Sequence, residues 1–277
     1  SPWMPKSRRT LCSVISVSTR VIALMGAGAF LLAGCGASVA TSDEVADTAS
    51  PSKASKKVDV ASLGNELRAE APGEVNPPAE SDGLPPVVRS IKTEDKVVFI
   101  TIDDGASADP KVMDIIRKTG IPVTPFLTKS EISGSKDYYK QISEMTGQKV
   151  QDHMISHPQM PGLSAEGQRK QICEPAASYT EWFGAKPWMF RPPYGEFNKV
   201  TQEAAKACGM DYIVMWNASL PKAYIRYAQG DKLKSGDIIL THWRPDLYKH
   251  LPRALKDIQQ QGFKVAALQD YLPQRGE

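Results

Sequence analysis

The chain has 277 residues, of which 41% are hydrophobic and 23% are charged. This composition is typical of a soluble globular protein with one sizeable core or two small ones. The formal net charge of +3 is too small to indicate a nucleic-acid-binding protein. The four charged residues before Cys35 are all basic, so the remainder is close to neutral and a strong overall field does not select its partner.

Residues 1–34 predict a signal for export. Arg20 is followed by an apolar run that is shorter than the roughly 20 residues of a membrane-spanning helix. The run ends Leu32-Ala33-Gly34-Cys35, which resembles the bacterial lipoprotein signal, where cleavage precedes a lipidated cysteine. We therefore predict a lipoprotein signal peptide over residues 1–34, lipidation of Cys35, and anchoring to the outer face of the cell membrane. An uncleaved anchor and an ordinary secretory signal are the alternatives.

Residues 35–90 predict a flexible linker. The stretch is rich in Ala, Ser, Pro and charged residues, and no aromatic residue occurs between Phe30 and Phe99. Such a segment buries too little apolar area to offset the entropy of ordering it. We expect a tether that holds a folded domain, residues 91–277, away from the membrane.

Apolar runs alternate with helical patterns in the remaining sequence, taken in chain order. We expect strands at residues 96–102, 123–127, 188–190, 212–216, 237–240 and 263–267. Helices are expected between them at residues 110–119, 137–146, 165–183, 198–208 and 251–261. This alternation predicts a parallel α/β sheet, either open or closed into a barrel. Chemistry in such folds gathers at the carboxyl ends of the strands.

Two carboxylates follow the first of these strands. Neighbouring side chains of a strand point to opposite faces, so Asp103 and Asp104 could not share one site if the strand continued. Gly105 permits a turn that would bring both into one cleft. A polar turn without a chemical role is the alternative interpretation.

Histidines form a second candidate cluster. His153 and His157 are four residues apart, so one helical turn would place both on the same face, a common way to present two metal ligands. His242 follows the strand at residues 237–240. An alternative is that these are ordinary surface or core histidines.

A third cluster, Arg191-Pro192-Pro193-Tyr194, follows the strand at residues 188–190. Two prolines stiffen this loop. A rigid loop suits an arginine held in place and a backbone N–H offered to a developing oxyanion. A structural turn with a solvent-facing arginine is the alternative.

Together these motifs resemble the polysaccharide deacetylases of the NodB-homology group, carbohydrate esterase family 4, over about residues 92–272. The four matching segments are residues 101–105, 153–158, 191–194 and 240–242. The resemblance implies a distorted, incomplete (β/α) barrel and a hydrolase that removes N-acetyl groups from peptidoglycan or a chitin-like polymer. An O-acetyl (xylan-type) esterase and a non-catalytic sugar-binding lipoprotein are the alternatives.

The resemblance also implies residue roles. A divalent metal would be bound by Asp104, His153 and His157. Zinc is the first candidate, and cobalt and nickel are the alternatives. Asp103 would act as the general base that takes a proton from water, and Arg191 would orient it.

Around these groups, the resemblance implies a leaving-group acid and a substrate pocket. His242 would protonate the departing amine or alcohol. The backbone N–H of Tyr194, beside Pro193, would help to stabilise the oxyanion, and Leu240 and Trp216 would line the pocket. We expect a monomer that binds an acetylated polysaccharide, meets the membrane only through its lipid, and has no nucleic-acid partner.

One family motif is missing. The family carries Asp-x-x-Asp-Trp between its third and last motifs, and its acidic residue pairs with the arginine and tunes the catalytic histidine. Here residues 214–220 read VMWNASL, and residues 221–235 form a different loop. The sequence therefore leaves open what pairs with Arg191 and what tunes His242.

Two cysteines lie in the expected folded domain. Cys173 and Cys208 form an even pair in an exported protein, which predicts a disulfide. Two separate buried thiols are the alternative.

Overall fold

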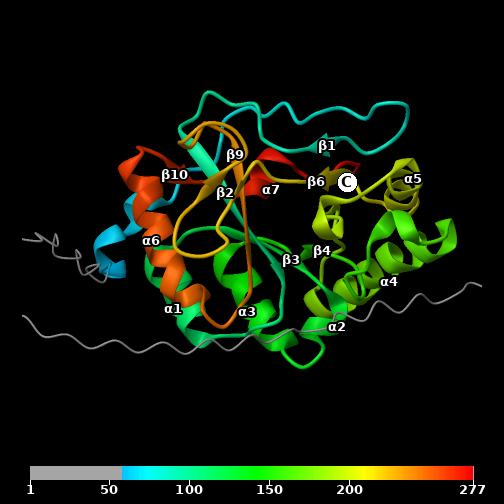
Figure 1. Ribbon diagram of the computed structural model, residues 1–277, viewed down its shortest axis with the longest axis horizontal. Helices are drawn as coiled ribbons and strands as arrows, with labels where there is room; N and C mark the ends of the chain where they lie inside the picture. Colours follow the sequence, from blue (N-terminus) through cyan, green and yellow to red (C-terminus); the bar gives the residue numbers. More distant parts are fainter. Residues whose placement is uncertain (1–57, 277) are drawn as a thin grey trace, which may run out of the picture. The chain divides into compact units, whose positions relative to one another are not determined.

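The computed structural model describes residues 58–276 (Figure 1). The predicted signal peptide, Cys35 and the first part of the linker lie outside these residues. No helix within the described part is both long and apolar enough to cross a membrane.

A ten-stranded, mostly parallel sheet forms the centre of the fold. Its strand order is β1-β6-β5-β4-β3-β2-β9-β7-β8, and β10 pairs with the start of β2. The strands are β1 Val87–Val88, β2 Val97–Asp104, β3 Val123–Leu127, β4 Gln151–Asp152, β5 Met189–Phe190, β6 Tyr212–Val214, β7 Ala218–Ser219, β8 Arg226–Tyr227, β9 Asp237–His242 and β10 Lys264–Val265. The sheet curls, and its end strands β1 and β8 do not pair within the described residues. The predicted distorted, incomplete (β/α) barrel is confirmed.

Helices follow the strands as the sequence predicts. They are α1 Pro110–Thr119, α2 Lys129–Ile132, α3 Lys136–Thr146, α4 Ala165–Phe183, α5 Lys199–Ala207, α6 Leu247–Gln260 and α7 Leu268–Tyr271. Asp109 accepts a hydrogen bond from the Lys111 N–H at the start of α1, and Gly120 ends that helix in the left-handed conformation. Helix α6 begins one turn before its predicted start, because a proline at position 252 is accommodated within it.

The two faces of β2 meet different surroundings. Val98, Ile100 and Ile102 pack with side chains of α1, α3 and α6, whereas Phe99 faces a second apolar cluster that contains Phe126. Since side chains alternate along a strand, Thr101 and Asp103 share the face of Phe99. This face therefore carries both core packing and polar groups.

The folded domain begins earlier than the sequence predicts. Residues 58–90 were expected to be a flexible linker, but Leu63 and Leu67 are buried in the main core. Strand β1 also pairs with β6, with Val87 opposite Ile213. A few apolar residues placed at the right points are enough to dock a polar segment, and an average over its composition misses them.

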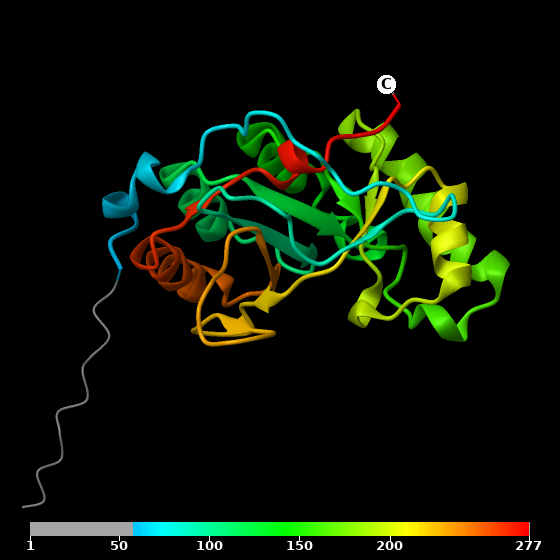
Figure 2. The same cartoon turned by 90° about the horizontal axis from the view of Figure 1, so that it is seen from above.

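Helices α4 and α5 pack together and are joined by the disulfide Cys173–Cys208. The structure thus contains the predicted pair and not two separate thiols. In both views these helices lie at the opposite end of the domain from α6 (Figures 1 and 2).

Candidate active site

Asp103 and Asp104 end β2 and reach one common site. Asp103 is buried, with 2% of its side chain exposed, and Asp104 takes a left-handed backbone conformation with φ of 75°. This turn breaks the strand alternation, so both carboxylates approach the same nitrogen, His153 Nε2, at 3.7 and 3.3 Å. Gly105 is required here, because a Cβ atom would lie 2.2 Å from Ile132 Cγ2.

His153 and His157 converge by a loop, which corrects the expected helical turn. The short strand β4 ends at Asp152, and the following residues Met154 and His157 have φ values of 74° and 62°. Two left-handed residues of this kind are uncommon and store strain that the surroundings must offset. The loop brings the Nε2 atoms of His153 and His157 to 3.3 and 3.5 Å from Asp104 Oδ1.

One candidate ligand atom from each of Asp104, His153 and His157 lies within 4.8 Å of the others. His153 Nδ1 is 2.7 Å from the carbonyl oxygen of Arg191, which can only accept, so Nδ1 donates. In the neutral ring, Nε2 therefore turns its lone pair toward Asp104. Asp104 Oδ1 is buried and has no hydrogen-bond partner among the described residues. A carboxylate oxygen facing nitrogen lone pairs is a suitable environment for a divalent cation such as zinc.

The pKa shifts in this cluster also favour a bound cation. Burial alone would lower the pKa of the His153 imidazole, but Asp103 and Asp104 raise it above its ordinary value. Burial and the neighbouring His153 lower the pKa of His157. Burial opposes ionisation of Asp104, yet the adjacent His153 ring brings the pKa of that carboxyl below its ordinary value. The carboxylates thus favour positive charge at the point where the ligand atoms meet.

Arg191 is fully buried, so the alternative of a solvent-facing arginine is wrong. Its Nη1 donates to Asp103 Oδ1 at 2.6 Å and to Thr101 Oγ1 at 2.8 Å. Its Nε and Nη2 donate to the carbonyl oxygens of Val214 and Met215 at 3.0 and 3.1 Å. Burial lowers the pKa of the guanidinium, while the charge of Asp103 acts in the opposite direction.

These contacts answer one question left by the missing acidic motif. Among the described residues, Asp103 is the one carboxylate paired with Arg191. Two main-chain carbonyls at the end of β6 accept hydrogen bonds from Nε and Nη2, so no second acidic residue is needed to hold the guanidinium.

Strand register places His242 and Leu240 at the same site. In the parallel pair of β2 and β9, Asp103 lies opposite His242 and Thr101 lies opposite Leu240. Opposite residues of paired strands share a face, so His242 lies on the Asp103 face. In the described part of the chain, no carboxylate lies within 4.0 Å of His242, although the other three histidines each have at least one.

Aromatic side chains border this cluster. Tyr194 has φ of 59° and is 62% exposed, and its ring meets the His157 ring edge-on at 4.7 Å. Pro193 beside it is buried. Trp216 is half-buried, with its ring centre 5.7 Å from the Arg191 guanidinium carbon. Tyr194 and Trp216, which were expected to contact substrate, thus lie beside His157 and Arg191.

Two buried polar residues were missed from the sequence. Thr101 binds Arg191 and donates to the Ile239 carbonyl oxygen at 2.9 Å, so it ties β2 to β9 as well. Its position two residues before Asp103 could have indicated this. Asp152 accepts a hydrogen bond from the Met154 N–H at 2.7 Å and so supports the strained loop, and burial raises the pKa of its carboxyl well above the ordinary value.

Comparison with known proteins identifies the family. The model of the family "Polysaccharide deacetylase" matches residues 90–213. An uncharacterized protein of Streptomyces coelicolor is 37% identical over 199 residues, which are 68% of this chain and 78% of that protein. The chain belongs to the polysaccharide deacetylase family.

Other relatives of this polysaccharide deacetylase are more distant. A peptidoglycan-N-acetylglucosamine deacetylase of Bacillus cereus is 23% identical over 200 residues, 67% of this chain and 92% of that enzyme. The crystal structure of a CE4 family pseudoenzyme from Bacillus anthracis matches with a TM-score of 0.58 and 24% identity, covering 68% of this chain and 69% of that one. At this identity the structural match shows the fold alone. His242 lies beyond the residues that the family model matches.

Proposed function

We propose that this polysaccharide deacetylase uses a divalent metal ion to remove N-acetyl groups from a cell-envelope polysaccharide built on N-acetylglucosamine. Zinc is the first candidate for this ion. The observation that carries the proposal is the cluster of Asp104, His153 and His157 directly beside the buried pair of Asp103 and Arg191. A sugar-binding protein would need neither the base nor the arginine that holds it.

The residues divide the work of amide hydrolysis. Asp104, His153 and His157 would hold the cation, which would supply Lewis-acid polarisation of a carbonyl oxygen and a lowered pKa of water. Asp103 uses Oδ1 to bind Arg191, which leaves Oδ2, 3.7 Å from His153 Nε2, to accept the proton of the attacking water. Arg191 fixes the carboxylate so that little reorganisation accompanies this transfer.

Two further groups act on the substrate. His242 lies across from Asp103 in the paired strands and would protonate the departing amine. The Tyr194 main chain is held in an unusual left-handed conformation within a proline-stiffened loop, which suits a fixed N–H donor toward the oxyanion. Leu240, 7% exposed, would contact the acetyl methyl group.

The substrate and the location are inferred from a relative and from the N-terminal sequence. The Bacillus cereus relative named above acts on peptidoglycan N-acetylglucosamine by its name, and a tethered exported enzyme meets that polymer first. Export and lipidation of Cys35 rest on the apolar run and its Leu-Ala-Gly-Cys ending. We propose a monomer without nucleic-acid partners, anchored to the outer face of the cell membrane.

Release of acetate by the full chain tests the function. We would offer N-acetylglucosamine oligomers, peptidoglycan, acetylated xylan and a small activated acetyl ester, with zinc and then with a chelator. We expect release from the N-acetyl substrates that stops with chelator and returns when zinc is restored. Release from xylan alone would point to an O-acetyl esterase. Absence of release from every substrate, with zinc bound, would support the sugar-binding alternative.

A further inference from the structure

A groove runs along the flank of the domain between α1 and α6, and none of the residues in the candidate active site lines it. Its volume is about 1410 Å³, and the segment around Tyr224 forms part of its wall. Both views place the segment of residues 218–227 beside α6 (Figures 1 and 2).

The groove is basic although the domain is neutral. Residues 58–276 contain 27 Lys and Arg and 27 Asp and Glu. The groove walls contain five of these basic residues and only two acidic ones, Asp114 and Asp257. Asp114 already pairs with Lys118 at 2.8 Å. Positive charge is thus concentrated here against an even background.

Most of the cations in the groove are unpaired. Within the described residues, no carboxylate lies within 4.0 Å of four of them: Lys111, Lys249, Arg253 and Lys256. The last three are spaced by four and three residues on the exposed side of α6. Like charges at this spacing repel one another and disfavour the helix. Folding therefore gives no reason for this row.

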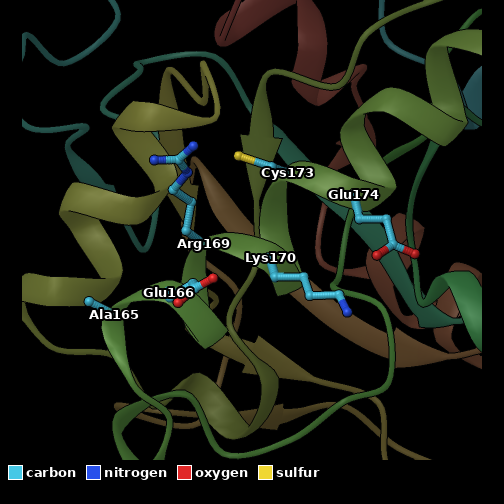
Figure 3. Close-up of a pocket in the computed structure, with 6 residues that line it drawn as sticks. All are labelled: Ala165, Glu166, Arg169, Lys170, Cys173 and Glu174. Carbon is cyan, nitrogen blue, oxygen red and sulfur yellow. The ribbon is translucent and has the colours of Figure 1, made fainter.

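Aromatic rings accompany the charges. Lys111 Nζ and Lys249 Nζ lie 4.3 and 5.7 Å from the centre of the Tyr248 ring, and Tyr224 is 63% exposed. A second surface hollow, on α4, offers a contrast: Figure 3 shows its Arg169 and Lys170 interleaved with Glu166 and Glu174. An excess of basic over acidic residues is thus a feature of the α1/α6 groove and is not found in the hollow on α4.

The groove begins at the catalytic edge of the sheet. Helix α1 starts six residues after Asp104, and α6 starts five residues after His242, so both helices run back from that edge. Lys111 and Lys249 are in their first turns, and Lys118 and Lys256 lie further along. A chain bound in the groove could continue into the active site.

We propose that the α1/α6 groove binds an anionic stretch of the substrate polysaccharide, one that carries carboxylate or phosphate groups. The inference rests on the proposed function and names the class of polymer. The row of three unpaired cations on α6, together with Lys111 of α1, matches a line of negative charges, and the exposed Tyr224 ring suits a sugar ring. The hollow between two helices accommodates a single strand better than a flat lipid surface.

The test compares two charge reversals in the full chain. Arg253→Glu changes the groove, and Arg169→Glu makes the same change of charge on α4, at the other end of the domain. Binding would be measured to a polyuronate, to poly(glycerol phosphate), to neutral N-acetylglucosamine oligomers and to vesicles of equal parts phosphatidylglycerol and phosphatidylcholine. Acetate release from the small activated ester reports on the catalytic centre separately.

We expect Arg253→Glu to weaken binding to at least one polyanionic glycan about tenfold, to reduce its salt dependence, and to leave the neutral oligomers unaffected. Arg169→Glu should change none of these. The unfolding temperature of Arg253→Glu should not fall, because the new carboxylate lies between Lys249 and Lys256. The polymer that responds identifies carboxylate or phosphate as the recognised group.

Two results would overturn the groove assignment: an equal loss of polyanion binding in both variants, or no binding of either polyanion by the parent chain. Loss of vesicle binding alone in Arg253→Glu would also overturn it and assign the groove to a lipid surface. If the small ester is hydrolysed, these outcomes leave the proposed function standing. If no acetyl substrate is hydrolysed while the polyanion still binds, the proposed function fails, but the assignment of the groove as a polyanion site holds.

Discussion

At the scale of single residues, the site depends on the fully buried guanidinium of Arg191. Arg191 has one counter-charge, Asp103, and its other donors meet a hydroxyl and two carbonyl oxygens. Neutral acceptors satisfy hydrogen bonds but do not compensate charge. Asp103 therefore has two functions, as the proposed base and as the partner that makes burial of the arginine tolerable.

Asp103→Asn should separate these functions. We expect zinc to be retained, because Asp104, His153 and His157 are unchanged, and acetate release to be lost. We also expect destabilisation of about 3–5 kcal/mol, since the variant leaves a buried charge without its partner. Zinc content, acetate release and urea unfolding would measure the three effects. Adding Arg191→Met should recover part of the stability but no activity, and normal turnover by Asp103→Asn would disprove the base assignment.

Thr101 should position Arg191 through its hydroxyl. Thr101→Val keeps the shape and leaves one N–H of Arg191 without an acceptor, at a cost of about 1–3 kcal/mol. We expect kcat to fall and Thr101→Ser to restore most of it. Thr119→Val is a matched control, because Thr119 is equally buried and donates to the Ile115 carbonyl oxygen far along α1. If both valine variants lose stability and neither changes kcat, Thr101 is structural only.

His153→Ala should abolish zinc retention. His153 would provide one of the three proposed ligand atoms, and its ring is oriented by the Arg191 carbonyl oxygen. His250→Ala is the control, since His250 pairs with Asp246 on α6 outside the cluster. Metal content after dialysis against a weak chelator would be compared. Stoichiometric zinc in His153→Ala would remove this residue from the ligand set.

At the scale of elements, some segments are predictable from local sequence and others are not. Helices α1 and α4 begin and end where their caps, Asp109, Ser164, Gly120 and Gly184, predict, because capping depends on neighbouring residues. The loop after β4 differs: spacing alone predicts a helical turn, but His153 and His157 are brought together by two left-handed residues. That conformation depends on the distant partners that stabilise it, which no local pattern reveals.

The disulfide between α4 and α5 should contribute to stability without affecting chemistry. It closes a loop with a sequence separation of 35, and its loss removes a constraint on the unfolded chain worth about 2–4 kcal/mol. We expect Cys173 and Cys208 to resist alkylation until the protein is reduced. The double variant Cys173→Ala/Cys208→Ala should unfold at lower temperature and keep its zinc. Ready alkylation of both residues in the native protein would contradict the bond.

At the scale of the whole molecule, the alternation of strands and helices predicted a parallel sheet and the edge where its polar residues gather. The curled, incomplete barrel was implied by the family resemblance and not by the alternation. Asp103 and His242 lie at the carboxyl ends of β2 and β9, and Arg191 follows β5; Asp103 lies beside both because parallel strands present their carboxyl ends together. The extent of the domain was not predictable. Residues 58–90 have the composition of a linker, and only the assembled core reveals where Leu63, Leu67 and Val88 are buried.

A chain cut at residue 91 should therefore fold poorly, although the family match begins at residue 90. The cut exposes the core surface under Leu63 and Leu67 and leaves the β6 edge without β1. Leu67→Ala isolates the first effect and should cost about 2–5 kcal/mol, because its side chain is fully buried. Leu84→Ala, at a half-buried position of the same segment, is the control and should cost much less. Urea unfolding of these variants, and of chains starting at residues 58 and 91, measures how much residues 58–90 contribute to the free energy of unfolding. Equal stability of the two shortened chains would show that residues 58–90 are a tether after all.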